Sequence, residues 1–384
     1  MSNIDDLLAK MCPDGVASLT VGDLCQIKTG KKDVNQGNPT GQFPFFTCSR
    51  NHTYSDSYSF DGEALLVAGN GDVGLVQYFN GKFEAYQRTY VLMNFQRVLV
   101  QFLSHYLRAY LVQHLSVLKQ DGTIPYIKLG MLKDFKIPVP PLEIQKEIVA
   151  ILDNFTDLEA ELEAELEARK LQFEFFRDEA MSRLDDSNSK EVSISECAGI
   201  FDGTHQTPTY ISEGVKFVSV ENIDSLASSS KYISKEDYEE LYKTKPQKGD
   251  LLMTRIGSVG RCAVIDVEEP LAYYVSLALI KTDKNMISTP FLKHYLESHS
   301  GRLALDKKTL HHAVPLKINL GDIGKVQIRV PNSIIQEEVT TLLDKFQDYI
   351  YSPSSGLLAE IRARRQQYEY YRNKLLTFKE LDVA

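Results

Sequence analysis

The sequence predicts an α+β protein built from two similar modules of short strands and short helices, each followed by one long helix. Two stretches of the chain, 137–155 and 328–346, repeat each other at a constant offset of 191 residues. Each stretch opens a long segment in which apolar residues recur every three or four positions. Each is preceded by short β-type runs separated by Gly and Asn turns. Because self-similarity at a fixed period defines the structural unit, half of the chain is the unit.

The repeat divides the chain into four predicted parts. The first module covers residues 1–140, and the first long helix covers residues 141–183. The second module covers residues 184–330, and the second long helix covers residues 331–380. At 384 residues the chain is long enough for two cores of ordinary size.

The repeated stretch keeps the same residues at the start of both long helices. A proline suits the first turn of a helix, because its missing N–H costs nothing there. One glutamine, one aspartate and several apolar residues follow it in both copies. The matched pairs are Ile137 with Ile328, Val139 with Val330, Pro140 with Pro331, Gln145 with Gln336, Glu147 with Glu338, Leu152 with Leu343, Asp153 with Asp344 and Phe155 with Phe346.

Both long segments are predicted to be helices that pack against each other along one seam. Glu, Arg and Lys fill the positions between the apolar residues, as in paired helices. The far ends also match, since the aromatic and basic segment 169–177 recurs as 364–372 at an offset of 195 residues. Residues 352–356 (Ser-Pro-Ser-Ser-Gly) interrupt the second helix, and we place the extra residues of the second copy there.

The first long helix contains a short leucine repeat. Leu158, Leu162 and Leu166 each begin a tetrad that continues Glu-Ala. One tetrad adds about 6 Å of helix, so this segment is suited to set a distance between the modules. The simpler interpretation is a solvated acidic face on a stable helix, and residues 141–183 carry −7 of the net charge of −9.

The two modules also align with each other, more loosely than the helices. Segment 65–74 corresponds to 251–260, and His105-Tyr106-Leu107 corresponds to His294-Tyr295-Leu296. A helix is expected near residues 98–118 and another near 288–304. The matched positions keep apolar residues and change polar ones, as expected of duplicated binding modules that share a fold and bind different targets.

The composition is typical of a soluble cytoplasmic protein, with 43% hydrophobic and 25% charged residues. No apolar run approaches the ~20 residues that span a bilayer. The N-terminus lacks the features of a signal peptide. The acidic net charge does not exclude nucleic acid, because binding depends on local patches. The cysteines form no C-x-x-C and are expected to be reduced thiols; they are Cys12, Cys25, Cys48, Cys197 and Cys262.

The sequence contains no P-loop, H-E-x-x-H, G-x-S-x-G or C-x-x-C pattern, and no Asn-Pro-Pro-Tyr or Asp-Pro-Pro-Tyr motif of amino-methyltransferases. Segment 69–74 fits the pattern G-x-G-x-x-G of dinucleotide-binding loops. Such a loop must be followed by a helix, whereas a strand and a turn are expected after residue 74. We therefore predict that this segment is a tight β-turn. No Cys or carboxylate cluster accompanies His311-His312, which favours a surface loop over a metal site.

Polar side chains in the predicted loops are candidates for contacts with DNA. Arg, Asn and Gln can bond bidentately to base edges, whereas Lys mainly contacts phosphates. Each single residue is equally well explained as a solvated surface side chain, so the set as a whole carries the prediction. In the first module the candidates are Lys31, Lys32, Arg50, Asn70, Asp72 and Arg88. In the second they are His205, Glu221, Asn222, Arg255, Ser258 and Arg261, with Lys243, Lys245, Lys248, Lys307 and Lys308 as phosphate contacts.

The chain resembles the DNA specificity subunits of type I restriction-modification systems. The resemblance rests on the motif at 137–149 and its recurrence, on the helix ends at 169–177 and 364–372, and on 249–260 (Gly-Asp-Leu-Leu-Met-Thr-Arg-Ile-Gly-Ser-Val-Gly). It covers nearly the whole chain in the family's order of recognition domain, central helix, recognition domain and distal helix. The second copy departs from the motif at Asn332-Ser333, where the first has Pro141-Leu142.

The resemblance implies a non-catalytic subunit whose two target recognition domains each bind half of a bipartite, asymmetric site in the major groove of double-stranded DNA. The two helices would pack antiparallel, set the spacer and dock two modification subunits. Those subunits would bind S-adenosylmethionine and methylate adenine, and restriction subunits, which would bind ATP and Mg, would add ATP-driven translocation and cleavage. The chain itself would hold no cofactor, no metal and no catalytic residue.

Two other functions stay open at the level of the sequence. The chain could be a fused DNA methyltransferase or nuclease with divergent motifs, which methyl transfer by the isolated chain would indicate. It could also be a coiled-coil adaptor, which failure to bind any DNA would indicate.

Overall fold

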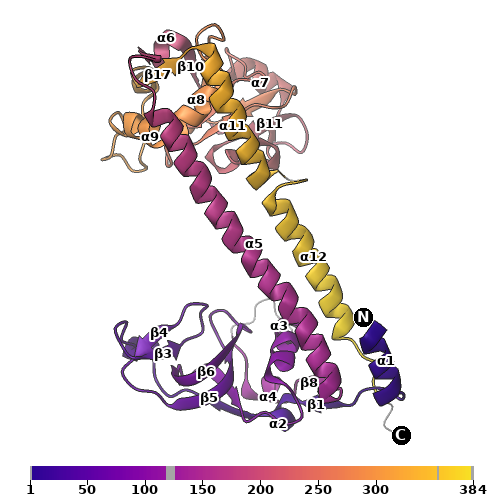
Figure 1. Cartoon of the computed structure of the whole chain (residues 1–384). Coiled ribbons are helices and arrows are strands. Elements are labelled where there is room, and N and C mark those ends of the chain that lie inside the picture. Colours follow the sequence, from indigo (N-terminus) through magenta and orange to yellow (C-terminus); the bar gives the residue numbers. More distant parts are fainter. Residues whose placement is uncertain (1, 118–125, 353, 382–384) are drawn as a thin grey trace. The chain divides into compact units, whose positions relative to one another are not determined.

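The computed structural model describes residues 2–117, 126–352 and 354–381, and the chain divides into two units. One unit contains Met1–Leu162 and Ile361–Ala384, and the other contains Glu163–Glu360. Each unit joins one module to parts of both long helical segments (Figure 1). The predicted helix end at residue 118 and Pro353 of the predicted break lie outside the described residues.

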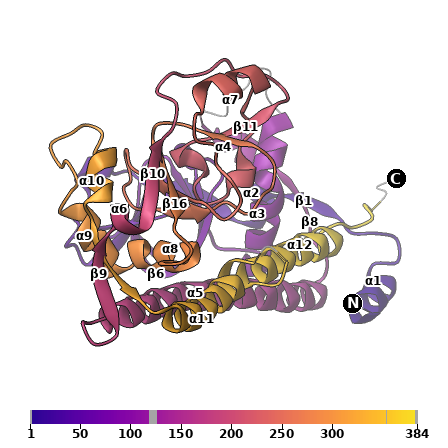
Figure 2. The same ribbon diagram turned by 90° about the horizontal axis from the view of Figure 1, so that it is seen from above.

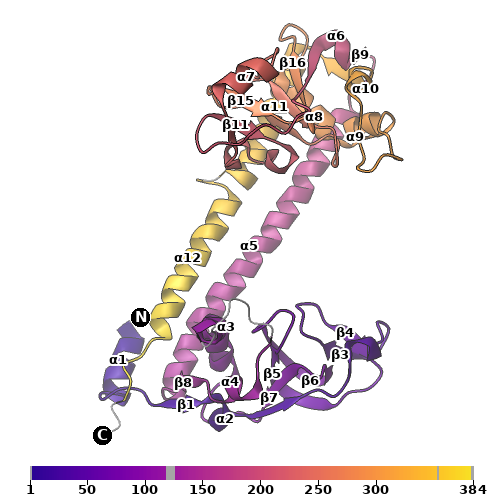
Figure 3. The ribbon, with the colours of Figure 1, turned by 180° about the vertical axis from the view of Figure 1, so that it is seen from behind.

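The first module is built on a six-stranded sheet in the order β2-β7-β5-β6-β3-β4, seen with the helix α3 in Figure 3. Strand β5 pairs antiparallel with β6 and with β7, and β3 runs parallel to the end of β6. The strands are β2 (Gln26–Thr29), β3 (Phe43–Phe46), β4 (Thr53–Ser55), β5 (Phe60–Ala68), β6 (Val76–Ala85) and β7 (Thr89–Met93). The helices are α1 (Ser2–Met11), α2 (Val21–Leu24), η1 (Val34–Gln36), α3 (Val100–Val117) and α4 (Leu129–Lys133).

Strand β5 shows why this sheet is buried on both faces. Successive side chains of a strand point to opposite faces. Leu65 and Val67 therefore pack in the cluster that contains the buried residues of α3, such as Leu107. Ala64 and Leu66 pack in a separate aromatic cluster on the other face. The continuous apolar run of β5 thus serves two cores.

The second module repeats this plan with its sheet divided in two. The sheets have the orders β10-β16-β13-β14 and β12-β11-β15. Strand β14 pairs with β13 as β6 pairs with β5, and β15 runs parallel to β11 as β6 does to β3. One long strand is therefore replaced by two, and Pro270, which cannot donate to a ladder, lies between them. The strands are β10 (Ala198–Asp202), β11 (Val215–Val218), β12 (Tyr232–Ile233), β13 (Leu251–Thr254), β14 (Cys262–Val264), β15 (Leu271–Tyr273) and β16 (Leu277–Thr282).

The helix predicted near 288–304 is two helices, α8 (Thr289–Glu297) and α9 (His299–Asp306). Ser298 ends the first, and its hydroxyl accepts the N–H of Gly301 in the second. A serine in this position satisfies a donor that the helix cannot. The remaining helices are α6 (Ile194–Cys197), η2 (Val220–Asn222), η3 (Leu226–Ser228), α7 (Lys235–Leu241) and α10 (Leu320–Gly324).

A two-stranded ribbon precedes each long helix. Strand β1 (Ser18–Thr20) pairs with β8 (Lys136–Pro138), and β9 (Ser189–Ser193) pairs with β17 (Gln327–Pro331). Each ribbon brings the two ends of its module together at the start of the helix that follows.

The helix expected over residues 141–183 is α5 (Leu142–Ser182). The second long helical segment, expected over residues 331–380 with an interruption, consists of two helices, α11 (Ser333–Tyr351) and α12 (Leu357–Leu375). The break falls at the predicted 352–356, where a proline and a glycine disfavour helix. Residues 376–380 leave the helix, and Glu380 forms a bridge with Val16 of the first module.

In the first unit α5 and α12 pack antiparallel. Phe155 stacks on Tyr371 with ring centroids 5.6 Å apart. One turn later on α5, Glu159 pairs with Arg365, which precedes Tyr371 on α12. The direction of the two helices is therefore opposite.

The second unit uses the equivalent contacts between α11 and α5, which lie side by side in Figure 2. Phe346 is the match of Phe155, and its ring centroid lies 5.8 Å from that of Phe173 and 6.1 Å from that of Phe176. Phe176 is in turn the match of Tyr371. The internal repeat of the sequence is therefore a repeat of packing contacts. None of the helices in the described part of the chain is long and apolar enough to cross a membrane.

Candidate nucleic-acid interface

Four loops meet at one end of the first sheet and form what we call the first loop surface: 30–33, 47–52, 69–75 and 86–88. Backbone hydrogen bonds hold them together. The N–H of Asp72 bonds to the carbonyl of Cys48 at 3.0 Å, and that of Gly69 to Arg88 at 2.9 Å. The N–H of Gln87 bonds to the carbonyl of Lys32 at 3.0 Å. All six residues predicted for the first module lie on these loops.

Most of these six side chains face solvent. Lys31, Arg50, Asp72 and Arg88 are exposed, and Asn70 is half-buried. The predicted tight turn is confirmed, since 69–75 joins β5 to β6 and no helix follows it. Gly71 and Gly74 have φ of 61° and 81°, a conformation that favours glycine.

Lys32 is engaged within the module. Its Nζ donates to the hydroxyls of Ser55 and Ser57, each at 2.7 Å. It also lies 3.4 Å from the carboxylate of Glu84, which is buried. A buried carboxylate needs a nearby cation, so Lys32 stabilises the sheet edge.

The second loop surface comprises the loops 203–207, 219–224, 255–261 and 274–276. The N–H of Arg255 bonds to the carbonyl of Ser276 at 2.9 Å, and that of Val275 to Thr204 at 3.0 Å. Six residues predicted for the second module lie on these loops: His205, Glu221, Asn222, Arg255, Ser258 and Arg261.

Three of these side chains make local contacts. Ser258 and Glu221 are exposed, and the carboxylate of Glu221 lies 3.7 Å from Nζ of Lys231. Arg261 pairs with Asp224 on a neighbouring loop. The side chain of Asn222 accepts the N–H of Ser219 at 3.2 Å and so closes its own turn.

Arg255 is buried, with 7% of its surface exposed. Its Nη2 donates to both carboxylate oxygens of Asp202, at 2.8 and 3.0 Å. The same carboxylate lies 2.7 Å from Nε2 of His205, which is exposed. Arg255 is therefore placed beneath the second loop surface, and His205 is the member of this cluster that faces solvent.

The predicted phosphate contacts are not all brought together. Lys248 lies just before β13, at the end of this strand opposite to the loop 255–261 of the second loop surface. Nζ of Lys248 pairs with the carboxylate of Glu268 at 3.0 Å. Lys245 pairs with Glu239, and Lys243 is exposed after α7. Lys307 and Lys308 are exposed at the end of α9.

His311 lies 3.3 Å from the carboxylate of Asp306. Within residues 2–117, 126–352 and 354–381, no group of three or more His, Cys, Asp or Glu is placed to hold a metal ion.

The two loop surfaces share one backbone framework. In each, the last residue of a central strand accepts an N–H from a glycine six residues later at 2.9 Å. In each, the residue that follows this strand bonds to two other loops. The paired bonds are Gly74 to Ala68 with Gly260 to Thr254, Gly69 to Arg88 with Arg255 to Ser276, and Ile127 to Gly69 with Ile318 to Arg255.

The framework carries different groups at equivalent positions. Gly69 and Thr29 of the first module correspond to Arg255 and Asp202 of the second. In the first module these positions line a cavity of about 340 Å³. In the second, the Arg255–Asp202 pair occupies the equivalent positions. The two surfaces therefore differ in shape as well as in charge.

Three residues that line the cavity at the first loop surface were not predicted from the sequence. Gln87, Tyr126 and Lys128 line the same cavity as Arg88. A signal for them was present, since Ile127 and Leu129 match Ile318 and Leu320 at the offset of 191 residues that relates the helices. That match places the segment after α3 beside the loops in both modules.

The helices expose apolar side chains at equivalent positions. Phe175 on α5 and Tyr370 on α12 match at the offset of 195 residues, and each is 63% exposed. Two further leucines, Leu171 on α5 and Leu342 on α11, are exposed to 68% and 65% but do not match each other in the repeat. Exposed aromatic and aliphatic groups on a helix face are typical of a surface that binds another protein.

Comparisons with known proteins agree with this arrangement. Residues 13–168 match the family model of the type I restriction modification DNA specificity domain. A putative type I restriction enzyme specificity subunit of Haemophilus influenzae is 28% identical over 360 residues, which are 88% of this chain and 89% of that protein. The EcoDI specificity subunit of Escherichia coli is 37% identical over 138 residues, which are 35% of this chain and 30% of that protein.

Two solved structures have a similar fold. The S subunit of a type I restriction-modification system from M. genitalium gives a TM-score of 0.57 at 16% identity, covering 94% of this chain and 96% of that one. A chain from a structure on complex assembly and conformational transition of the type I R-M system gives a TM-score of 0.61 at 17% identity, covering 95% and 98%.

Proposed function

Because the chain belongs to the family of DNA specificity subunits of type I restriction-modification systems, we propose that each module binds one half of a bipartite DNA site through its loop surface. The observation that carries this proposal is the shared backbone framework with different side chains. Equal frameworks present the loops to DNA in the same way. Different exposed side chains, such as Asp72 against Ser258 in the matched segments 65–74 and 251–260, favour different bases, so the site is asymmetric.

The test is to map methylated adenines across the genome of cells with and without this chain, its modification subunit being present in both. The expected result is one bipartite, asymmetric motif that is methylated only when the chain is present. A chain-dependent motif without two separated halves would contradict the proposal.

We further propose that α5 and α12 dock two modification subunits at the exposed aromatic positions Phe175 and Tyr370. Equivalent positions suit two copies of one partner. Phe175→Glu together with Tyr370→Glu is expected to abolish association with the modification subunits while leaving the fold intact, because both side chains already face solvent. Restriction subunits would join the same assembly.

The chemistry is assigned to the partners. S-adenosylmethionine would be bound by the modification subunits, and ATP and Mg by the restriction subunits, in the cytoplasm. Purified chain mixed with labelled S-adenosylmethionine and target DNA should transfer no methyl group until the modification subunit is added. Transfer by the chain alone would favour a fused enzyme, but the relatives described above carry the names of specificity subunits.

A further inference from the structure

A buried glutamine attaches the first module to its helix. The side chain of Gln145 on α5 is fully buried. Its Oε1 accepts the N–H of Leu99 at 2.8 Å, and its Nε2 donates to the carbonyls of Arg97 at 3.0 Å and Pro140 at 2.8 Å. Arg97 has a φ of 62°, a strained conformation for a residue other than glycine. The amide therefore holds a strained loop of the module against the helix.

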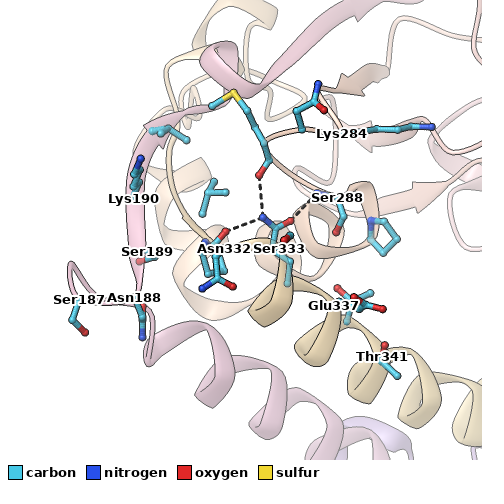
Figure 4. A pocket seen from close by; sticks show the side chains of 18 of the residues that line it. Ser187, Asn188, Ser189, Lys190, Lys284, Ser288, Asn332, Ser333, Glu337 and Thr341 are labelled. Carbon is cyan, nitrogen blue, oxygen red and sulfur yellow. Dashed lines mark hydrogen bonds between the residues drawn. The ribbon is translucent and has the colours of Figure 1, made fainter.

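Gln336 makes the same attachment in the second unit. Its Oε1 accepts the N–H of Ser288 at 2.8 Å, and its Nε2 donates to the carbonyls of Met286 at 3.0 Å and Pro331 at 2.9 Å. Figure 4 shows these bonds at the edge of a cavity of about 790 Å³, next to Ser288 and Asn332. The repeated glutamine of the sequence is thus a structural clamp in both halves.

A histidine–aspartate pair forms a second attachment in each unit. Nε2 of His105 on α3 lies 2.8 Å from the carboxylate of Asp153 on α5. Nε2 of His294 on α8 lies 2.7 Å from that of Asp344 on α11. In each helix the aspartate follows the glutamine by eight residues, which is about 12 Å along the axis. Two attachments separated by this distance prevent the module from pivoting on its helix.

In each module one strand connects the loop surface, at its start, to the clamped loop, after its end. Strand β7 runs from the loop 86–88 to the clamped loop 94–99, and β16 runs from 274–276 to the clamped 286–288. The five or six residues of each strand, with the loops at its ends, separate the clamped loop from the loop surface by a distance on the order of 20 Å. A tilt of roughly 10° at the clamp would move the loop surface by about 3.4 Å, which is one base-pair step.

We propose that Gln145, Gln336 and the two His–Asp pairs are positioning residues that determine how strictly the complex selects the spacer length of its DNA site. This inference rests on the proposed function. The four attachments lie at the helix and act through the angle of the module, so they leave the choice of bases within each half-site unchanged.

The test uses the full chain in complex with its modification subunits. Asp153→Ala, Asp344→Ala and the double variant are compared on DNA that carries both half-sites with spacers from two base pairs shorter to two longer. The aspartate side chains are 48% and 50% exposed, so their removal leaves the cores intact. We compare methylation at spacers one base pair longer or shorter than the preferred length with methylation at the preferred length. The double variant is expected to raise this ratio about tenfold. Each single variant should raise it by a smaller factor.

Asp157→Ala and Asp348→Ala are matched controls. These exposed aspartates follow Asp153 and Asp344 by four residues on the same helices, and their removal should leave the spacer profile unchanged. Asp153→Asn, which keeps an acceptor for His105, should also retain the profile. Methylation that falls equally at all spacers, or a change in the bases required, would overturn the proposal. If the unsubstituted chain directs no bipartite methylation at all, the proposed function itself fails.

Discussion

At the scale of residues, one atom distinguishes the two histidine clusters. Nδ1 of His105 lies 3.5 Å from the hydroxyl of Tyr368. Nδ1 of His294 has no hydrogen-bond partner among the described residues, and its ring faces Phe173, the match of Tyr368. Phe173→Tyr is expected to raise the free energy of unfolding by about 1 kcal/mol, because it supplies the missing partner. Denaturant unfolding measures this, with Tyr368→Phe as the reverse change. A loss of stability in Phe173→Tyr would show that the ring site has no room for the hydroxyl.

The same histidines predict how stability depends on pH. Burial lowers the pKa of His105 and of His294 from the ordinary value of 6.5, although the aspartates oppose this. A proton then binds the unfolded chain more readily than the folded one, so acidification below about 6.5 destabilises the fold. The melting temperature should fall between pH 7.5 and pH 5.5. A double variant with His105→Asn and His294→Asn should show a smaller fall; an equal fall would assign the effect to other groups.

Two residues predicted to contact DNA are instead paired with carboxylates that are distant in the sequence. Arg255 and Lys32 were predicted as DNA contacts because they are cations in loops. The structure pairs Arg255 with Asp202, 53 residues away, and Lys32 with the buried Glu84. Such pairing depends on the sheet topology, which neighbouring residues in the sequence do not reveal.

At the scale of elements, the leucine tetrads of α5 predict a spacer effect. Deleting residues 162–165 shortens the helix by about 6 Å and turns it by about 40°. The preferred spacer should become shorter by about two base pairs, since each step is about 3.4 Å. Methylation mapping with the deletion variant gives the answer. A functional variant with an unchanged spacer would rule out α5 as the ruler.

Element boundaries followed the sequence where local chemistry sets them. The start of α5 after two prolines and the break at 352–356 were both predicted, because proline and glycine act locally. The division of the second sheet was not predicted. Whether a strand continues, as β6 does, or stops, as β14 does, depends on which partner strands are available.

At the scale of the whole molecule, the duplication was predictable but its division into units was not. The offset of 191 residues indicates two modules and two helices. The structure instead groups each module with the beginning of one long helical segment and the end of the other. Antiparallel packing produces this grouping; the family resemblance implied that direction correctly, whereas the repeat alone does not specify it.

If two equivalent frameworks carry different DNA-binding surfaces, exchanging one module for the other should change the half-site that is bound. The most direct test replaces residues 194–326 with residues 21–135. Both segments are closed by the same backbone bond, from Val21 to Phe135 at 2.9 Å and from Ile194 to Val326 at 3.0 Å. Methylation mapping of the folded chimera should yield a symmetric site made of the first half-site and its inverted copy. Continued dependence on the original second half-site would show that the second module does not select that half-site.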